Sequence, residues 1–103
     1  MEMEMEMEMD GSKSELHFVF MNYDPEYERL RSIKTERGAE ELDLYLSRKH
    51  DGILAKNLQP GTYNKTLSLV IVDGFAVELT DHQANVLRSA KEVRIVEKNQ
   101  ELA

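Results

Sequence analysis

The stretch 73–84 limits the possible folds of this chain most narrowly, because it predicts a turn, a strand and the start of a helix in direct succession. Asp73-Gly74 is typical of a tight hairpin turn, since glycine readily adopts the positive φ that such turns require. Apolar side chains then recur at every second position, which is the pattern of a strand with one buried face. The buried side chains predicted for this strand are Phe75, Val77 and Leu79.

A helix is predicted directly after this strand. Thr80 and Gln83 have the spacing of a capping box, in which two side chains satisfy backbone N–H groups at the first turn of a helix. Val86, Leu87 and Ala90 then share one stripe of the predicted helix and indicate its buried side.

The rest of the chain adds three predicted strands and at least one helix. Aromatic and branched apolar residues gather in three further segments, which predict strands. These segments are 16–21, 63–72 and 93–97. Between Gly38 and Leu58 apolar residues recur every three or four positions, which predicts a long helix. Asp24-Pro25 is a good helix start, but the residues that follow fit either a short helix or an ordered loop.

This order of elements predicts an α+β fold of the ferredoxin-like type, β-α-β-β-α-β. In that two-layer sandwich, an antiparallel four-stranded sheet carries two helices on one face, and the other face is bare. The apolar run 69–72 indicates that both faces are at least partly covered, one by helices and the other by a partner.

Alternation along each strand assigns its side chains to the two faces. In strand 16–21 the predicted core side chains are Leu16, Phe18 and Phe20. His17 then points away from the core and is interpreted as an ordinary surface histidine. On strand 75–79 the bare face receives Ala76 and Glu78, so we expect this face to be small, apolar and mildly acidic.

The net charge of −7 is concentrated at the N-terminus. Residues 1–10 hold five of the 20 acidic residues, so 15 acidic residues face 13 basic ones in the remainder. Such a domain lacks the basic face that binds a phosphate backbone. The predicted bare face also lacks the aromatic side chains on which RNA-binding sheets stack bases. We therefore expect no nucleic-acid partner.

Residues 1–14 are of low complexity and alternate Met with Glu over most of their length. Crowded carboxylates and the lack of a core-forming pattern predict a disordered tail. The segment lacks the basic start and apolar centre of a secretory signal peptide. The chain also has no apolar stretch of about 18 residues, so no membrane contact is expected.

The sequence does not predict an enzyme. A hydrolase needs a nucleophile, a base and an orienting acid, but no serine lies in a Gly-x-Ser-x-Gly elbow. His17, His50 and His82 are scattered, no pair has the helical spacing of a zinc site, and cysteine is absent. We expect no catalytic residue, metal site, cofactor or small-molecule ligand.

Two segments resemble the prodomains of plant subtilisin-like serine proteases, the subtilases. The first is Gly-Phe-Ala-x-x-Leu-Thr-x-x-Gln-Ala-x-x-Leu at 74–87, followed by Val-x-x-Val-Glu at 93–97. The second is Arg-Lys-His-Asp at 48–51, which precedes the Gly-x-Tyr turn at 61–63. The resemblance covers about residues 16–103, and the Met-Glu repeat has no counterpart in it. Asp73 stands where the family often has Asn.

This resemblance implies an inhibitor and intramolecular chaperone of a subtilisin-like serine protease. The bare face, with Ala76 and Glu78, would pack against the protease. The C-terminal tail would lie extended in the substrate cleft, with Ala103 placed like the last residue of a cleaved product. The predicted cleft-binding residues are Asn99, Gln100, Glu101, Leu102 and Ala103.

The chain is thus predicted to contain a tail at 1–14, a propeptide-like domain at 15–97 and an extended tail at 98–103. As part of a subtilase precursor it would enter the secretory route, although this chain shows no signal peptide. The alternative is a ferredoxin-like module that binds a protein partner unrelated to proteolysis.

Overall fold

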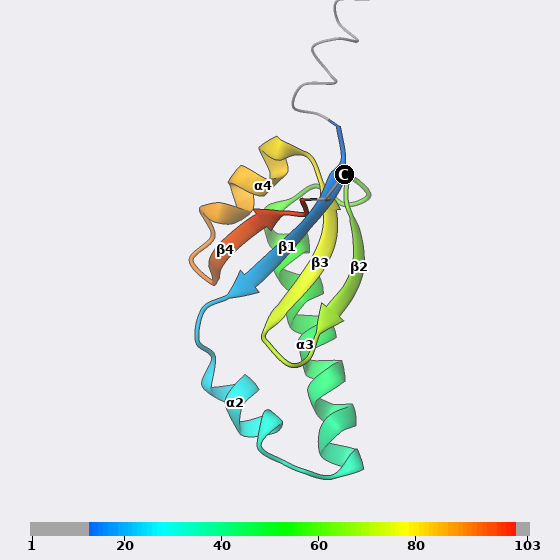
Figure 1. The fold of residues 1–103 in the computed structure, drawn as a ribbon, viewed down its shortest axis with the longest axis vertical. Coiled ribbons are helices and arrows are strands. Elements are labelled where there is room, and N and C mark those ends of the chain that lie inside the picture. The colour runs from blue at the N-terminus through cyan, green and yellow to red at the C-terminus, as the bar shows by residue number, and fades with distance from the viewer. Residues whose placement is uncertain (1–12, 101–103) are drawn as a thin grey trace, which may run out of the picture.

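The computed structural model describes residues 13–100, with elements in the order β-α-α-β-β-α-β (Figure 1). The strands are β1 (Glu15–Met21), β2 (Asn64–Leu69), β3 (Gly74–Leu79) and β4 (Val93–Lys98). The helices are α2 (Pro25–Arg31), α3 (Glu36–Asn57) and α4 (Asp81–Arg88). Two parts of the predicted tails lie outside the described residues. They are residues 1–12 of the predicted Met-Glu tail and residues 101–103 of the predicted C-terminal tail.

The four strands form one antiparallel sheet in the order β2-β3-β1-β4. The long helix α3 and the shorter α4 both lie on one side of this sheet (Figure 1). This arrangement confirms the predicted ferredoxin-like α+β sandwich. The short helix α2 is an addition to it: α2 lies beyond the end of β1 and packs on the N-terminal half of α3.

Local capping signals explain where the helices begin. Asp24 caps α2, its carboxylate accepting a hydrogen bond from the Glu26 N–H at 3.0 Å, and Pro25 follows at the first helical position. The open choice between a helix and a loop is thereby settled in favour of a helix. At α4 the predicted capping box is confirmed, because Thr80 Oγ1 accepts from Gln83 N at 3.1 Å and Gln83 Oε1 accepts from Thr80 N at 3.0 Å.

The predicted hairpin is present, but its turn is not centred on the expected Asp73-Gly74 pair. Gly74 is the first residue of β3, and the connection from β2 is the four-residue loop 70–73. Within the described range the one residue with positive φ is Gly61, at 81°. Glycine is required at position 74 for a different reason. A Cβ there would lie 2.7 Å from the carbonyl oxygen of Val19 and 3.0 Å from Phe20 Cδ1.

The face assignment of β1 is also wrong. His17, Val19 and Met21 point to the helices and are buried, whereas Leu16, Phe18 and Phe20 point to the other side and are half-buried. The strand register requires this, because Val19 lies opposite Phe75 and His17 opposite Val77, and directly paired residues share a face. His17 is 1% exposed, and its Nδ1 donates to the carbonyl oxygen of its neighbour Glu15 at 2.8 Å.

The core consists of two clusters on the helical side of the sheet. The larger one joins the sheet to α4 and the C-terminal half of α3, and the smaller one joins α2 to the N-terminal half of α3. The smaller cluster contains Tyr27, Leu30, Leu42 and Leu46. No helix in the described range is long and apolar enough to span a membrane.

Replacing Gly74 with alanine should lower the free energy of unfolding by about 1–3 kcal/mol, because the added methyl group meets a backbone carbonyl that cannot move freely. The matched control is Gly52→Ala in α3, where nothing lies within 4 Å of the new Cβ. That change should raise the stability by about 0.5–1 kcal/mol. Urea unfolding followed by circular dichroism measures both, and equal effects of the two changes would contradict this account of Gly74.

Candidate functional site

The sheet face opposite α3 and α4 is covered by no helix within residues 13–100 (Figure 1). We call it the open face. Its members follow from the register, since Phe18 pairs with Ala76 on one side and Glu97 on the other, and Phe20 pairs with Ile95. The outward side chains are Leu16, Phe18, Phe20, Asn64, Leu67, Leu69, Ala76, Glu78, Ile95 and Glu97.

The open face is mostly apolar, from the edge strand β2 across to the edge strand β4. Leu67 and Ile95 are 47% and 38% exposed, and two half-buried phenylalanines of β1 lie between their strands. Ala76 and Glu78 are on this face as predicted, but Ala76 is only 3% exposed because its cross-strand neighbours cover it. The larger side chains therefore provide most of the accessible apolar area. Contact of Ala76 and Glu78 with a protease stays a prediction.

The position of Phe18 and Phe20 removes one reason for excluding RNA. Both rings lie outward on β1, a central strand, which is where RNA-binding sheets carry stacking aromatics. The expectation of no nucleic-acid partner now depends on charge alone. Glu78 and Glu97 lie on the same face, and carboxylates repel a phosphate backbone.

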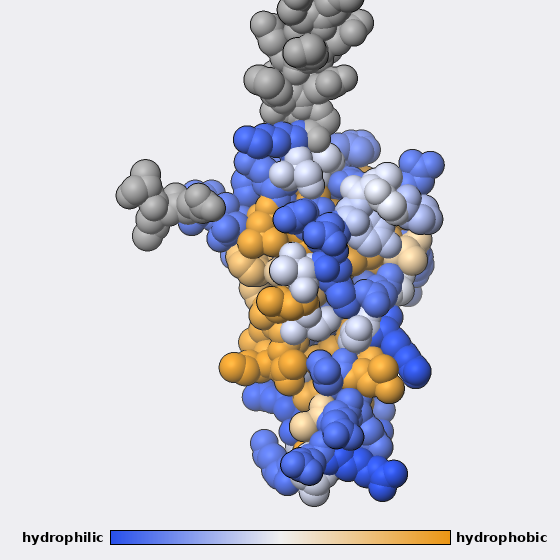
Figure 2. All heavy atoms as spheres, turned by 90° about the vertical axis from the view of Figure 1, so that its right-hand side faces the viewer, coloured by the Kyte–Doolittle hydropathy of each residue, from blue (hydrophilic) through white to orange (hydrophobic). Residues whose placement is uncertain are grey.

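The loop 70–73 extends the apolar surface beyond the sheet. We call Val70, Ile71 and Val72 the hairpin tip; they are 42%, 85% and 44% exposed. Figure 2 shows hydrophobic side chains gathered at the level of this hairpin, above a hydrophilic lower end. The sequence assigned these residues to a strand, so their exposure was not predicted.

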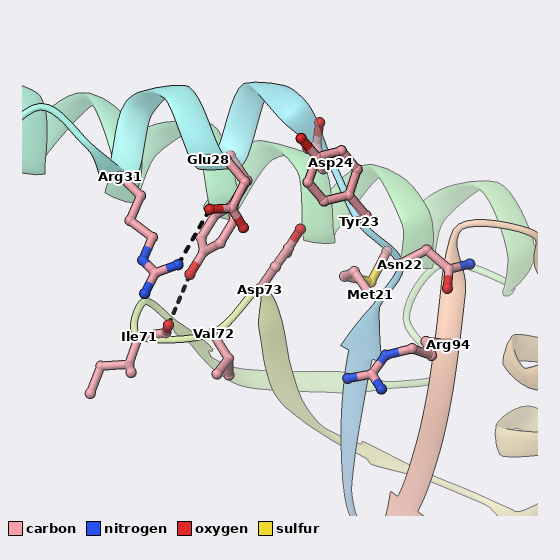
Figure 3. Close-up of a pocket in the computed structure, with 11 residues that line it drawn as sticks. Met21, Asn22, Tyr23, Asp24, Glu28, Arg31, Ile71, Val72, Asp73 and Arg94 are labelled. Carbon is pink, nitrogen blue, oxygen red and sulfur yellow. Dashed lines mark hydrogen bonds and ion pairs between the residues drawn. The ribbon is translucent and has the colours of Figure 1, made fainter.

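The backbone of the hairpin tip is held by α2. The Tyr27 hydroxyl lies 2.9 Å from the carbonyl oxygen of Val70 and 3.0 Å from that of Ile71, so its single hydrogen is shared between two acceptors. Arg31 lies over the Tyr27 ring, 5.9 Å from its centroid. Beside these groups is a pocket of about 320 Å³ between α2, the tip and the ends of β1 and β4 (Figure 3).

A buried polar network fixes the base of the same loop. Lys49 of α3 forms ion pairs with Asp73, at the end of the loop, and with Asp24, the cap of α2, at 2.9 Å. His50 Nε2 lies 2.8 Å from Asp73 Oδ1 and donates to it, because a carboxylate only accepts. His50 Nδ1 is 2.8 Å from the hydroxyl of Ser68 on β2.

The network is sheltered from solvent on the helical side of the sheet. His50 is fully buried, and its ring packs on that of Phe75 with centroids 4.7 Å apart. The Tyr45 hydroxyl donates to Asp24 at 2.5 Å. No buried side-chain nitrogen or oxygen in the described residues lacks a hydrogen-bond partner. These charges and dipoles are therefore compensated, which a buried ion pair requires in order to stabilise a fold.

The interactions within the network stabilise the charged forms of Asp24 and Lys49. Burial by itself raises the pKa of Asp24, but hydrogen bonds from Tyr45 and Lys49 outweigh burial and bring this pKa below its ordinary value. Burial by itself lowers the pKa of Lys49, and hydrogen bonds to Asp73 and Asp24 outweigh it and raise this pKa. The ammonium group of Lys49 and the carboxylates of Asp24 and Asp73 therefore keep one another in position.

The C-terminal segment leaves the sheet beside the start of β1. β4 extends to Lys98, one residue beyond the predicted strand, and Asn99 N–H still donates to the carbonyl oxygen of Leu16 at 2.9 Å. Lys98 pairs with Glu15 at 2.9 Å and with Asp81 at 3.2 Å. Asn99 and Gln100 are exposed, and the other predicted cleft residues, 101–103, lie outside the described range.

Metal or catalytic chemistry finds no support in this geometry. Among residues 13–100 no group of three or more histidine, aspartate or glutamate side chains could hold a metal ion. His17 and His50 are both buried and hydrogen-bonded within the fold. The distinguishing surface of residues 13–100 is an open apolar sheet face beside an exposed terminal segment, and exposed apolar patches of this kind mark interaction sites.

Comparison with known proteins places this domain in a family. The family described as peptidase inhibitor I9 matches residues 46–103, more than half of the chain, so the chain belongs to the peptidase inhibitor I9 family. The resemblance to subtilase prodomains is thereby confirmed. Members of an inhibitor family are not catalytic, which agrees with the expectation that this domain is not an enzyme.

One curated relative supports the same assignment. The chain is similar to the subtilisin-like protease SBT2.5 of Arabidopsis thaliana, with 41% identity over 56 residues. The aligned part is 53% of this chain and 7% of the protease, so the chain spans a small fraction of that relative. No solved structure matches the chain significantly.

Protonation of Asp24 should weaken the fold in acid. Because the pKa of Asp24 is lower in the folded chain than in the unfolded one, its stabilising effect is present above about pH 4 and is lost as the pH falls below it. Asp24→Asn keeps a capping side chain but removes the charge. It should lower the free energy of unfolding at pH 7 by about 1.5–3 kcal/mol and flatten its dependence on pH between about 4 and 2.

The measurement is urea unfolding at a series of pH values. Asp43→Asn is the matched control, because Asp43 is an exposed carboxylate on α3. The control should follow the unmodified chain at every pH. If Asp24→Asn also follows it, the Asp24–Lys49 pair does not have the role assigned to it.

Proposed function

We propose that this chain inhibits a subtilisin-like serine protease. In this proposal the open face packs on the surface of the protease, and residues 99–103 lie in its substrate cleft. The observation that carries the proposal is an apolar sheet face, covered by no helix of residues 13–100, in a member of the peptidase inhibitor I9 family. Two further features support it, namely the composition of the face and the exit of the C-terminal segment.

The open face has the composition of a protein interface. The phenylalanines of the inner strand β1 lie between leucine side chains of β2 and an isoleucine of β4, and the carboxylates of Glu78 and Glu97 are exposed beside them. Interfaces commonly combine an apolar centre with a polar rim. Burying the centre removes apolar surface from water at about 25 cal/mol per Å², which is the main source of affinity. Leu67 and Ile95 would contribute most, since they are the most exposed apolar side chains of the face.

The C-terminal segment is suited to bind as an extended strand. It continues directly from β4, and its root is fixed by the Asn99–Leu16 hydrogen bond and the ion pairs of Lys98. An extended peptide in a protease cleft pairs through its main chain, as in strand addition. Ala103 would then occupy the place of a product's last residue, with Leu102 behind it. Inhibition by such occupancy needs no reactive side chain.

The same binding would make the chain a folding aid for the protease. A partner that binds only the folded state stabilises it by mass action, and the effect grows with the affinity. This holds whether the domain is joined to the protease or acts as a separate chain. The intramolecular chaperone role is thus a consequence of the same interface.

Removing residues 99–103 should weaken inhibition. We expect the inhibition constant of the version ending at Lys98 to rise at least about tenfold, or about 1.4 kcal/mol, because the cleft is no longer filled. The assay is residual activity of purified subtilisin-like proteases on a short chromogenic peptide. Equal inhibition by both versions would contradict the role of the tail. No inhibition by either, across several proteases, would favour a protein-binding module unrelated to proteolysis.

The open face can be tested with two leucines of similar exposure. Leu67 lies on the open face and is 47% exposed, whereas Leu44 lies on α3 and is 52% exposed. Leu67→Ser should raise the inhibition constant about fivefold to tenfold, as expected when an apolar contact is lost from an interface. Leu44→Ser should leave it unchanged. The same inhibition constant for both variants would show that the protease does not bind the open face.

A further inference from the structure

The hairpin tip is an exposed apolar segment with a fixed backbone. Tyr27 binds the carbonyl groups of Val70 and Ile71, and Lys49 and His50 bind Asp73 at the end of the loop. The Ile71 side chain is nevertheless 85% exposed, so it contributes little to the core. A rigid loop that presents an isoleucine to solvent has the form of an interface anchor, because little entropy is lost when it binds.

The hairpin tip continues the open face at the end of the sheet away from the C-terminal tail. Leu69 and Gly74 flank the loop and pair with each other, and Gly74 also pairs with Phe20. The Phe20 ring lies close to Gly74. The tail leaves beside Leu16, at the opposite end of β1. A partner lying along β1 on the open face would therefore meet the tail at one end and the tip at the other.

The pocket beside the tip combines apolar walls with an available positive charge. Ile71, Val72 and Met21 are among its lining residues, and Arg31 from α2 and Arg94 from β4 lie on two sides of it (Figure 3). Asp24 and Asp73, which also line it, are engaged by Lys49.

Arg94 is the cation that stays available at this pocket. Glu28 pairs with Arg31 at 3.3 Å, whereas no carboxylate among residues 13–100 pairs with Arg94. Arg94 is also exposed at the pocket. The pocket is therefore complementary to an apolar side chain that has a carboxylate next to it.

We propose that the hairpin tip and this pocket form a second contact with the subtilisin-like protease and select among such proteases. The protease would place an apolar side chain against Ile71 and Val72, and an adjacent carboxylate against Arg94. This inference depends on the proposed function, since it needs the same partner. The two contacts have different consequences. The tail fills a substrate cleft that such proteases share, whereas the hairpin tip contacts a surface that can differ among them.

The test measures inhibition constants of Ile71→Ser and Arg94→Glu against a panel of purified subtilisin-like proteases. Against the protease that is most strongly inhibited by the unmodified chain, each change should raise the inhibition constant at least about tenfold. The effect should be smaller for weakly inhibited proteases, so the spread across the panel narrows. The effect of Arg94→Glu should shrink at high salt, and Arg94→Lys should restore part of the inhibition.

The matched controls are Leu44→Ser and Arg48→Glu, which make the same chemical changes at exposed positions of α3. Circular dichroism and the urea midpoint show whether each variant is folded. If Arg94→Glu does not fold, Arg94→Gln takes its place. An inhibition constant equal to that of its control, for either variant, overturns the proposal. If the tail truncation still weakens inhibition in that case, the proposed function stands and only the second contact fails. If the unmodified chain inhibits no protease, both fail together.

Discussion

The ion pairs of Lys49 connect three parts of the chain that are far apart in sequence. Its ammonium group joins the cap of α2 at Asp24 to the base of the hairpin at Asp73, and both carboxylates are largely buried. Removing Lys49 would leave two largely buried carboxylates without their cation, a loss of the kind that commonly costs about 3–5 kcal/mol. The entry of the chain into α2, the end of the hairpin loop and the helix α3 are thus joined through one side chain.

The two sides of the sheet differ in which side chains they carry and in whether those side chains are covered. On the helical side of the sheet, His17 of β1 and His50 of α3 are tolerated in the core because each has a hydrogen-bond partner inside the fold. The open face keeps its aromatic and aliphatic side chains, and no helix among residues 13–100 covers them. Exposed apolar surface does not stabilise the isolated domain, and it is therefore the part of the structure that is best explained by a partner.

The sequence predicted most of the elements and the fold class, but it did not predict the side-chain contacts between distant segments. The capping box of α4 and the order of strands and helices involve residues close together in the chain, and both were predicted. The face of β1 was misassigned because Leu16, Phe18 and Phe20 look more apolar than the alternative set that contains His17. The network of Asp24, Lys49 and Asp73 joins distant segments, and its one local signal was the polar pair Lys49-His50 within the apolar stripe of α3. The hairpin tip was predicted as part of a strand because a run of branched apolar residues is typical of a buried strand, and here it forms an exposed loop.

The central claim is that the open face is the surface that a subtilisin-like protease covers. Hydroxyl-radical footprinting of the chain, alone and in complex with an inhibited protease, tests this most directly, because it reports the solvent access of individual side chains. The account predicts that Leu67, Ile95 and Phe18 lose reactivity in the complex, while two exposed side chains outside the sheet, Leu44 of α3 and Ile33 of the α2–α3 connection, keep theirs. Protection of Leu44 and Ile33 with unchanged reactivity of Leu67 and Ile95 would contradict it.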